Sequence, residues 1–341
     1  MSAPITPLHM QAPAAAEPAV ETYRGLCDAS AAVALDAEHF IVAEDEHNIL
    51  KIYRRGTPDP VGEVDLIDYL GTRKPNGKIK EADLEGAARV GKRIYWISSH
   101  GRDKDGEVEE TRYRFFATDV ADGGSGGTPP AVKPVTPPYR KLLEDLLAAE
   151  KPLTKLVASD LAEASKLPPK NKKGLNIEGL AAMPDGGLLI GFRGPRPGGQ
   201  AILLPLTNPE AVLGGTAKAA FGDPILLDLE ERGVRGIGYI GGRYVIAAGP
   251  YDDVSPGAPG GDFALYTWSP GEKPKKVALD LGKLNPEAVY EIPGTENVHI
   301  LSDDGGEKIE GKKCKDLAPA ETLPGGRPDL GVKPSGYRTN P

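Results

Sequence analysis

The chain has 341 residues, of which 43 are glycine and 33 are proline, and its formal net charge at pH 7 is −8. The glycine and proline content comes without a Gly-X-Y period, which excludes collagen and favours a fold with many tight turns between strands. The negative charge argues against nucleic-acid binding, which needs a basic face, and no apolar run approaches the roughly 18 residues that span a membrane.

The first segment, residues 1–20, has neither the basic start nor the apolar stretch of a signal peptide. We expect it to be a disordered N-terminal segment. The expected location is therefore cytoplasmic, or that of a trimmed secreted or periplasmic form. At the other end, residues 321–341 are expected to form a C-terminal tail.

A repeated pattern runs through the rest of the chain. Residues 83–87, 176–180 and 285–289 each read Asp or Asn, apolar, Glu, small, apolar, and a β-rich run follows each copy. Two degenerate copies are anchored at Ala31 and Arg235. The distance to the following run is that of one strand, one turn and the next strand, so each copy marks the start of a sheet.

Four short strands in each unit of roughly fifty residues are typical of a propeller blade. We therefore predict that residues 21–320 form an all-β, five-bladed β-propeller, in which the N-terminal strand, residues 21–27, pairs with the last blade and closes the ring. One interval between repeats is longer and contains residues 121–170. Leucines recur there at helical spacing over about 138–168, which predicts a helical insertion in blade two.

The chain has two cysteines, too few for a disulfide scaffold or a zinc site. Closure of the ring by the N-terminal strand would place Cys27 beside the strand that contains Cys314. The two residues are therefore a candidate disulfide, and the alternative is a pair of unrelated buried thiols.

The phrase LNIEGLAAMPDGGLLIGFRG at residues 175–194, with its echoes at Glu85 and Glu287, resembles the esterase-like phytase family and an uncharacterised bacterial domain family related to it. The second resemblance spans most of the chain and includes GRDKDGE and LPPKNKKGLNIEGL. It implies a propeller and suggests a hydrolase. The family offers no catalytic motif that can be carried over residue by residue, so the resemblance bears more on the fold than on the activity.

The starts of the first strands are expected to line one mouth of the central channel. Side chains two apart on a strand share a face, so Asn176 and Glu178 are predicted to point the same way. The alternative is that the repeated glutamates only lock neighbouring blades together, a device needed once per blade. The predicted ring consists of Glu85, Glu178, Glu287 and Arg235, with a gap at Ala31.

The ends of the second strands should reach the same mouth, and there the side chains differ from blade to blade. Such diversity at equivalent positions is typical of a specific site, although exposed loop ends are polar in many proteins. A lone histidine is more often a satisfied hydrogen-bonding residue than a catalyst. These candidates are Asp45, Glu46, His100, Arg193, Asp303 and Asp304.

Acidic oxygens at one mouth would suit a divalent cation, and calcium is the expected one because it takes six to eight oxygen ligands. The predicted metal ligands are Glu85, Glu178, Glu287, Asp45 and Asp303. The predicted catalytic residues are Glu178, His100 and Arg193. The predicted substrate-binding residues are Arg235, Arg193, Glu46 and Asn176.

These residues favour a metal-dependent hydrolase that acts on a small anionic ester, phosphoester or lactone in the central channel through metal-activated water. No P-loop spacing and no G-x-S-x-G nucleophile elbow is recognised, so nucleotide hydrolysis and serine-hydrolase chemistry are disfavoured. The alternative is a non-enzymatic propeller scaffold that binds a small molecule, or a protein partner at the helical insertion.

Overall fold

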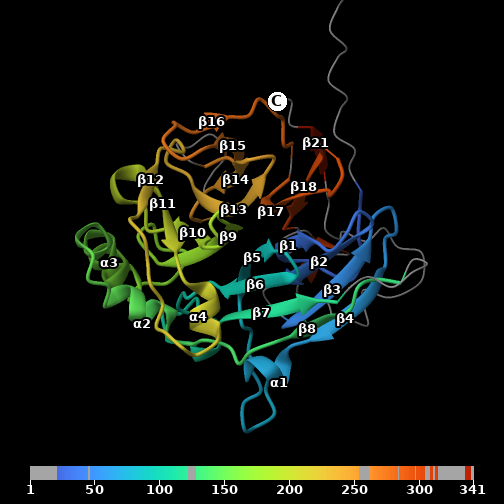
Figure 1. Ribbon diagram of the computed structural model, residues 1–341, viewed down its shortest axis with the longest axis horizontal. Coiled ribbons are helices and arrows are strands. Elements are labelled where there is room, and N and C mark those ends of the chain that lie inside the picture. The colour runs from blue at the N-terminus through green and yellow to red at the C-terminus, as the bar shows by residue number, and fades with distance from the viewer. Residues whose placement is uncertain are drawn as a thin grey trace, which may run out of the picture.

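The computed structural model describes residues 21–44, 47–121, 128–252, 261–282, 284–295, 297–303, 308–309, 312–313 and 335–338. This part of the chain is mainly β, with few helices, and its sheets are arranged around a common centre as in a propeller (Figure 1).

Four of the sheets have four antiparallel strands each, ordered from the centre outwards. The first contains β1 (Ala29–Ala34), β2 (His39–Glu44), β3 (Ile49–Arg54) and β4 (Pro60–Asp65). The second contains β5 (Leu84–Val90), β6 (Arg93–Ser98), β7 (Phe115–Val120) and β8 (Val132–Pro134). The third contains β9 (Asn176–Ala182), β10 (Leu188–Gly194), β11 (Ala201–Leu206) and β12 (Ile225–Leu227). The fourth contains β13 (Gly233–Ile240), β14 (Arg243–Gly249), β15 (Ala264–Trp268) and β16 (Lys275–Lys276).

A three-stranded sheet lies between the fourth and the first. It contains β17 (Pro286–Glu291), β18 (Asn297–Ser302) and β21 (Ser335–Arg338), and β17 contacts both β13 and β1. The inner strands β1, β5, β9, β13 and β17 thus contact one another in order around the channel (Figure 1). A separate pair consists of β19 (Lys308–Ile309) and β20 (Lys312–Lys313).

The helical elements are short. They are α1 (Ile67–Leu70), α2 (Leu142–Leu147), α3 (Pro152–Ala164), α4 (Pro209–Leu213) and the 3₁₀ helices η1 (Glu110–Arg112) and η2 (Pro197–Gly199). Among the residues that the structure describes, no helix is long and apolar enough to cross a membrane.

The prediction of a propeller with five four-stranded blades is wrong, because only four of the described sheets have four strands. Residues 21–28 belong to no strand and close no blade; the third strand of the remaining sheet is β21, from the other end of the chain. Side-chain packing holds the N-terminal segment instead. Tyr23 is buried and lies edge-on against Phe40 and Tyr53, with ring centroids 5.0 and 5.3 Å away.

The predicted helical insertion in blade two is also wrong. Strand β8 pairs with β7 and completes the second sheet before α2 and α3 begin, so the helices lie in the connection to the third sheet. Their leucines face the core. Leu142, Leu146 and Leu161 are buried in one cluster with Ile177 and Leu204 of the third sheet, and burial of one such side chain stabilises the fold by about 1.5–3 kcal/mol.

Candidate functional site

Each inner strand carries a β-bulge at its start. On β1, β5, β9, β13 and β17 the ladder skips one residue, which has no partner on the second strand of its sheet. A bulge bends the strand and re-aims a side chain. The skipped residues are Ser30, Glu85, Glu178, Arg235 and Glu287. The repeat anchors are therefore the bulge residues, and in the first sheet that residue is Ser30, one position before the predicted gap at Ala31.

A small residue follows every bulge because the inner strands approach one another closely. A methyl group on Gly236 would lie 2.2 Å from the carbonyl oxygen of Glu287, and one on Gly179 would lie 2.8 Å from Cγ1 of Val234. Either contact would force the strands apart. The small position of the repeat is thus a packing requirement, whereas the preceding position faces the channel.

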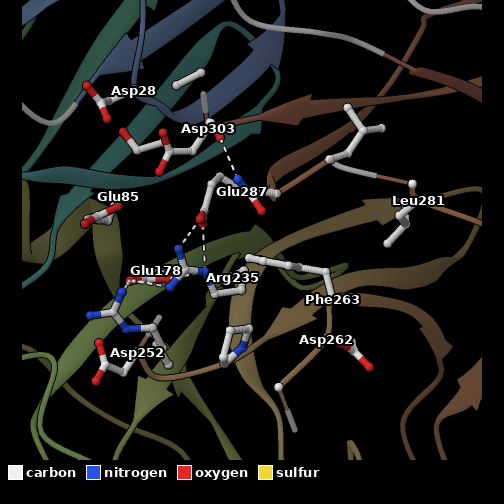
Figure 2. Close-up of a pocket in the computed structure, with 18 of the residues that line it drawn as sticks. Asp28, Glu85, Glu178, Arg235, Asp252, Asp262, Phe263, Leu281, Glu287 and Asp303 are labelled. Atoms are coloured by element: carbon white, nitrogen blue, oxygen red, sulfur yellow. Dashed lines mark hydrogen bonds and ion pairs between the residues drawn. The ribbon is translucent and has the colours of Figure 1, made fainter. Parts of the chain in front are cut away.

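A cavity of about 670 Å³ lies where the inner strands begin (Figure 2). We refer to it as the acidic cavity, since its charged lining has eight carboxylates and three basic groups. The carboxylates belong to Asp28, Glu85, Glu178, Asp252, Asp262, Asp280, Glu287 and Asp303, and the basic groups to Lys170, Arg193 and Arg235. The volume lies in the range of small-molecule sites, but the lining is far more acidic than that of a typical ligand pocket.

Four of these side chains form a continuous line of ion pairs on the cavity wall. Arg193 Nη1 lies 2.7 Å from Glu178 Oε1, and Arg235 Nε lies 3.0 Å from Glu178 Oε2. Arg235 Nε also donates to Glu287 Oε2 at 3.0 Å, and its Nη2 pairs with the other Glu287 oxygen (Figure 2). Asn176 Nδ2 donates to Glu178 Oε1 at 2.6 Å. We call Arg193, Glu178, Arg235 and Glu287 the ion-pair chain; it joins the third, fourth and three-stranded sheets.

Burial sets the charge state of the ion-pair chain. It raises the pKa of Glu287 to about 8; Arg235 opposes that rise and the neighbouring Glu178 adds to it. Burial alone would lower the pKa of Arg235, but the carboxylates of Glu178 and Glu287 outweigh burial and raise it. Glu287 can therefore hold a proton near neutral pH while Arg235 stays charged.

Two buried atoms of the ion-pair chain have no hydrogen-bond partner among the described residues: Glu178 Oε2, which has only its ion-pair contact with Arg235, and Arg193 Nε. Arg193 is 9% exposed, and its Nε is buried without a hydrogen-bond partner among the described residues. Arg193 is itself skipped in the pairing of β10 with β9, so a second bulge aims it at the cavity. A buried donor of this kind usually marks a place for water or a ligand oxygen.

His100 does not reach the cavity. It is 1% exposed, its Nδ1 lies 2.8 Å from the carbonyl oxygen of Ser98, and its ring lies edge-on to Tyr113. Burial lowers its pKa to about 4, so the ring is neutral at pH 7. The geometry favours a packing role for His100.

Beside His100 lies a network that the sequence did not indicate. Arg112 Nη1 lies 3.1 Å from Asp83 Oδ2, and Arg112 also pairs with Glu81. Ser99 donates to the same oxygen of Asp83. Arg112 comes from η1, outside the repeat, so no spacing in the sequence could link it to Asp83.

The acidic cavity unites most of the predicted site residues but not all of them. Glu85, Glu178, Glu287, Arg193, Arg235 and Asp303 line it, and Asn176, which is not in the lining, donates a hydrogen bond to Glu178. Asp45, Glu46, Asp304 and Cys314 lie outside the described residues, so their predicted roles, and the pairing of the buried Cys27, stay predictions.

Several lining residues were missed because they follow or precede strands without any repeated pattern. Asp28 precedes β1, and Asp252 and Asp262 lie between β14 and β15. Their only sequence signal is position: they lie at the same end of each sheet as the bulges. Phe263 adds one aromatic ring to the wall, with the Arg235 guanidinium carbon 5.7 Å from its centroid.

The calcium prediction stays a prediction. Within the described ranges, no group of three or more His, Cys, Asp or Glu side chains is placed to hold a metal ion. At the predicted centre, the guanidinium of Arg235 lies between Glu178 and Glu287 and supplies the positive charge that a cation would bring there. Any metal would need other carboxylates of the lining, such as Asp28 and Asp303.

The fold and the cavity together define a β-propeller with a ligand-sized, acidic mouth at one end of its channel. The chain belongs to the family described as Protein of unknown function (DUF3616), which matches residues 136–310. The matched segment contains the whole ion-pair chain, whereas Glu85 lies outside it. No curated protein matches, and no finding ties the chain to the esterase-like phytases that its sequence resembles.

Solved structures with a similar course of the chain include two sugar dehydrogenases. A putative oxidoreductase (glucose dehydrogenase) from Thermus thermophilus is 13% identical, with 94% of this chain and 99% of that one covered and a TM-score of 0.42. The PQQ-bound aldose sugar dehydrogenase from Streptomyces coelicolor is 12% identical, with 95% and 99% covered and a TM-score of 0.41. An engineered GH43 glycoside hydrolase is 13% identical, with 85% and 51% covered and a TM-score of 0.42. Likenesses this low carry no argument about the chemistry of the cavity.

Proposed function

We propose that the acidic cavity binds a small, uncharged, hydroxyl-rich compound and that the chain hydrolyses an ester bond in it, lactones included. The observation that carries this proposal is the ion-pair chain, which places buried carboxylates and guanidinium groups side by side on the wall of a cavity of about 670 Å³.

The charges favour hydroxyl groups over an anion. Eight carboxylates against three basic groups repel a negative ligand, and both Arg193 and Arg235 are already engaged by Glu178. A hydroxyl group both donates and accepts hydrogen bonds, so it can pair with carboxylates and with guanidinium groups in the same cavity. The ring of Phe263 offers an apolar surface for the C–H face of such a compound. We therefore place uncharged esters ahead of the anionic esters and phosphoesters that the sequence favours.

The proposed reaction uses two carboxyl groups. Glu85 accepts a proton from water, the water oxygen bonds to the carbonyl carbon, and the bond from that carbon to the alcohol oxygen breaks. Glu287, protonated because burial raises its pKa to about 8, gives its proton to the departing alcohol oxygen. The unpartnered Nε of Arg193 is a donor for the carbonyl oxygen, where negative charge develops. Glu178 positions both arginines.

The test substrate is D-glucono-1,5-lactone. Its hydrolysis at pH 7 is measured from the acid that is released, and the rate of spontaneous ring opening is subtracted. We expect the intact protein to accelerate opening and Glu287→Gln to lower kcat by about 10²-fold or more, the range typical of a lost general acid. The control is Glu163→Gln on α3, where the side chain is 76% exposed and pairs with Lys166. No acceleration with a panel of uncharged lactones and esters, or a full rate in Glu287→Gln, would contradict the proposal.

A metal-dependent form of the same activity is the second candidate, because the excess of carboxylates also favours a cation. Dialysis against a chelator followed by titration with CaCl₂ separates the two. A rate and a melting temperature that both rise with calcium support the metal-dependent form. A rate that survives chelation supports acid–base chemistry by the protein alone.

A further inference from the structure

A second cavity, of about 290 Å³, lies at the other end of the channel. It is lined where the inner strands end, by residues of all five of them, whereas the acidic cavity is lined where they begin. Most of the side chains that line it are apolar, as Val33, Ala182, Ile237 and Val289 illustrate. We refer to it as the apolar cavity.

The two cavities do not form one site. The space between them, at Glu178, Glu287 and the small residues that follow them, has a volume of only about 10 Å³. That is about the least volume that holds one water molecule. A ligand of the acidic cavity therefore does not extend into the apolar cavity.

One cation borders the apolar cavity without a carboxylate partner. Arg89 lines the cavity, and its guanidinium group donates to backbone carbonyl oxygens: Nε to Gly91 at 2.8 Å, and Nη1 to Ala34 at 2.7 Å and Leu35 at 2.5 Å. Among the described residues it forms no ion pair. Carbonyl groups orient the guanidinium but leave its charge uncompensated.

The acidic groups near this rim are not available to Arg89. Asp36 acts on it only at longer range, and its carboxylate accepts from the backbone amides of Glu38 and His39, both at 2.7 Å, and lies 3.0 Å from His39 Nδ1. Glu291 also lines the cavity, but it lies on β17. Strand β1 separates β17 from β5, the strand that carries Arg89. The side of the rim at Arg89 thus favours a negative group.

From this arrangement we infer that the apolar cavity binds a small amphipathic anion, an aromatic or short aliphatic carboxylate, with its apolar part between the inner strands and its carboxylate at Arg89. Its volume is close to the lower limit of small-molecule sites, so a molecule of one or two rings is the appropriate size. Cavities lined by apolar side chains take apolar groups in preference to water, and Nη2 of Arg89, which donates to none of these carbonyl groups, can donate to a carboxylate. This site is separate from that of the proposed hydrolysis.

The probe is 2-naphthoate, titrated into the full chain by calorimetry, with the uncharged 2-naphthalenemethanol as its matched analogue. We expect 2-naphthoate to bind about tenfold more tightly than the alcohol. Ala182→Leu, which fills the cavity from β9, should weaken both by about tenfold or more. Arg89→Gln should weaken only 2-naphthoate, to the affinity of the alcohol. Arg54→Gln, at an exposed arginine on β3, is the control and should change neither.

The cavity-filling variant keeps the test independent of Arg89, whose loss also removes three hydrogen bonds within the fold. Equal affinity for the acid and the alcohol overturns the assignment of Arg89. Binding that Ala182→Leu leaves unchanged, or no binding of either compound, overturns the site itself.

Discussion

Glu178 is the residue on which the acidic cavity depends most. It is 2% exposed and pairs with Arg193 and Arg235 at 2.7 and 3.0 Å. Glu178→Gln would leave two buried guanidinium groups without their full partner, so we expect the free energy of unfolding to fall by about 3–5 kcal/mol. Urea denaturation of the variant and the parent chain measures the difference.

Glu85→Gln is the matched control, because Glu85 is another bulge residue of the same repeat but is only half-buried. We expect it to cost about 1 kcal/mol or less. An equal cost for the two variants would mean that the repeated glutamates act only as a lock between sheets. A stable Glu178→Gln would mean that the ion-pair chain adds little to the fold.

Glu287 should make stability depend on pH. Its pKa rises from 4.5 in the unfolded chain to about 8 in the folded one, so between these values the native state holds a proton that the unfolded chain has released. The stabilisation is complete below about pH 4.5 and is lost as pH rises through 8. We expect the free energy of unfolding to fall over this range, with a slope of at most about 1.4 kcal/mol per pH unit.

The measurement is urea denaturation at several pH values from 5 to 8.5, for the parent chain and for Glu287→Gln. The difference between the two curves isolates the contribution of Glu287 to the pH dependence. His100 and His299 have lowered pKa values, so at acidic pH they make the free energy of unfolding rise with pH, and they do so equally in both proteins. Parallel curves for the two proteins would show that Glu287 is ionised across the whole range.

At the scale of elements, helix α3 is part of the core. Leu161 is fully buried in the cluster shared with the second and third sheets, whereas Leu156 on the same helix is 68% exposed. We expect Leu161→Ala to lower the free energy of unfolding by about 2–5 kcal/mol and Leu156→Ala by about 0.5 kcal/mol or less. Thermal or urea denaturation compares them. Similar small losses for both would mean that α3 adds little to the stability of the core. That result would favour the alternative in which the helical segment binds a protein partner.

The inner and second strands of each sheet could be predicted from the sequence, because the repeat combines a polar anchor, a small residue and a strand-length spacing. The same pattern located Glu85, Glu178 and Glu287 at one mouth. The bulges could not be predicted, since a skipped residue in the ladder leaves no mark in the alternation of side chains; Ser30 was therefore missed by one position. Arg112 was missed because a 3₁₀ helix outside the repeat brings it to Asp83.

The outermost strands and the ends of the chain were the least predictable elements. Short edge strands such as β8 and β16 carry little periodicity. Because β8 has only three residues, the sequence did not show that the second sheet ends before α2 and α3 begin. The third strand of the last sheet, β21, lies near the C-terminal end, in a region where the sequence favoured a tail. Pairing over such a distance is decided by tertiary contacts and not by local pattern.

At the scale of the whole molecule, the channel has two chemically different ends, and the ion-pair chain separates them. The ring of sheets is closed by contacts between the first sheet and the three-stranded sheet, which are far apart in the sequence. Tyr23 packs in the cluster that joins them, together with Phe40 of the first sheet and Tyr290 and Leu301 of the three-stranded one. The N-terminal segment thus contributes to closure through a side chain, although it adds no strand.

Replacement of Tyr23 should therefore weaken the whole ring. Tyr23 is 1% exposed, and we expect Tyr23→Ala to lower the free energy of unfolding by about 3–5 kcal/mol, as for other large buried rings. Tyr23→Phe keeps the ring and loses only the hydroxyl contacts to Glu21 and Gly56, so it should cost about 1 kcal/mol. Because closure links every sheet, fluorescence and circular dichroism should report one coincident transition in each protein. A separate early transition in Tyr23→Ala would show that the first and three-stranded sheets part before the rest of the ring unfolds.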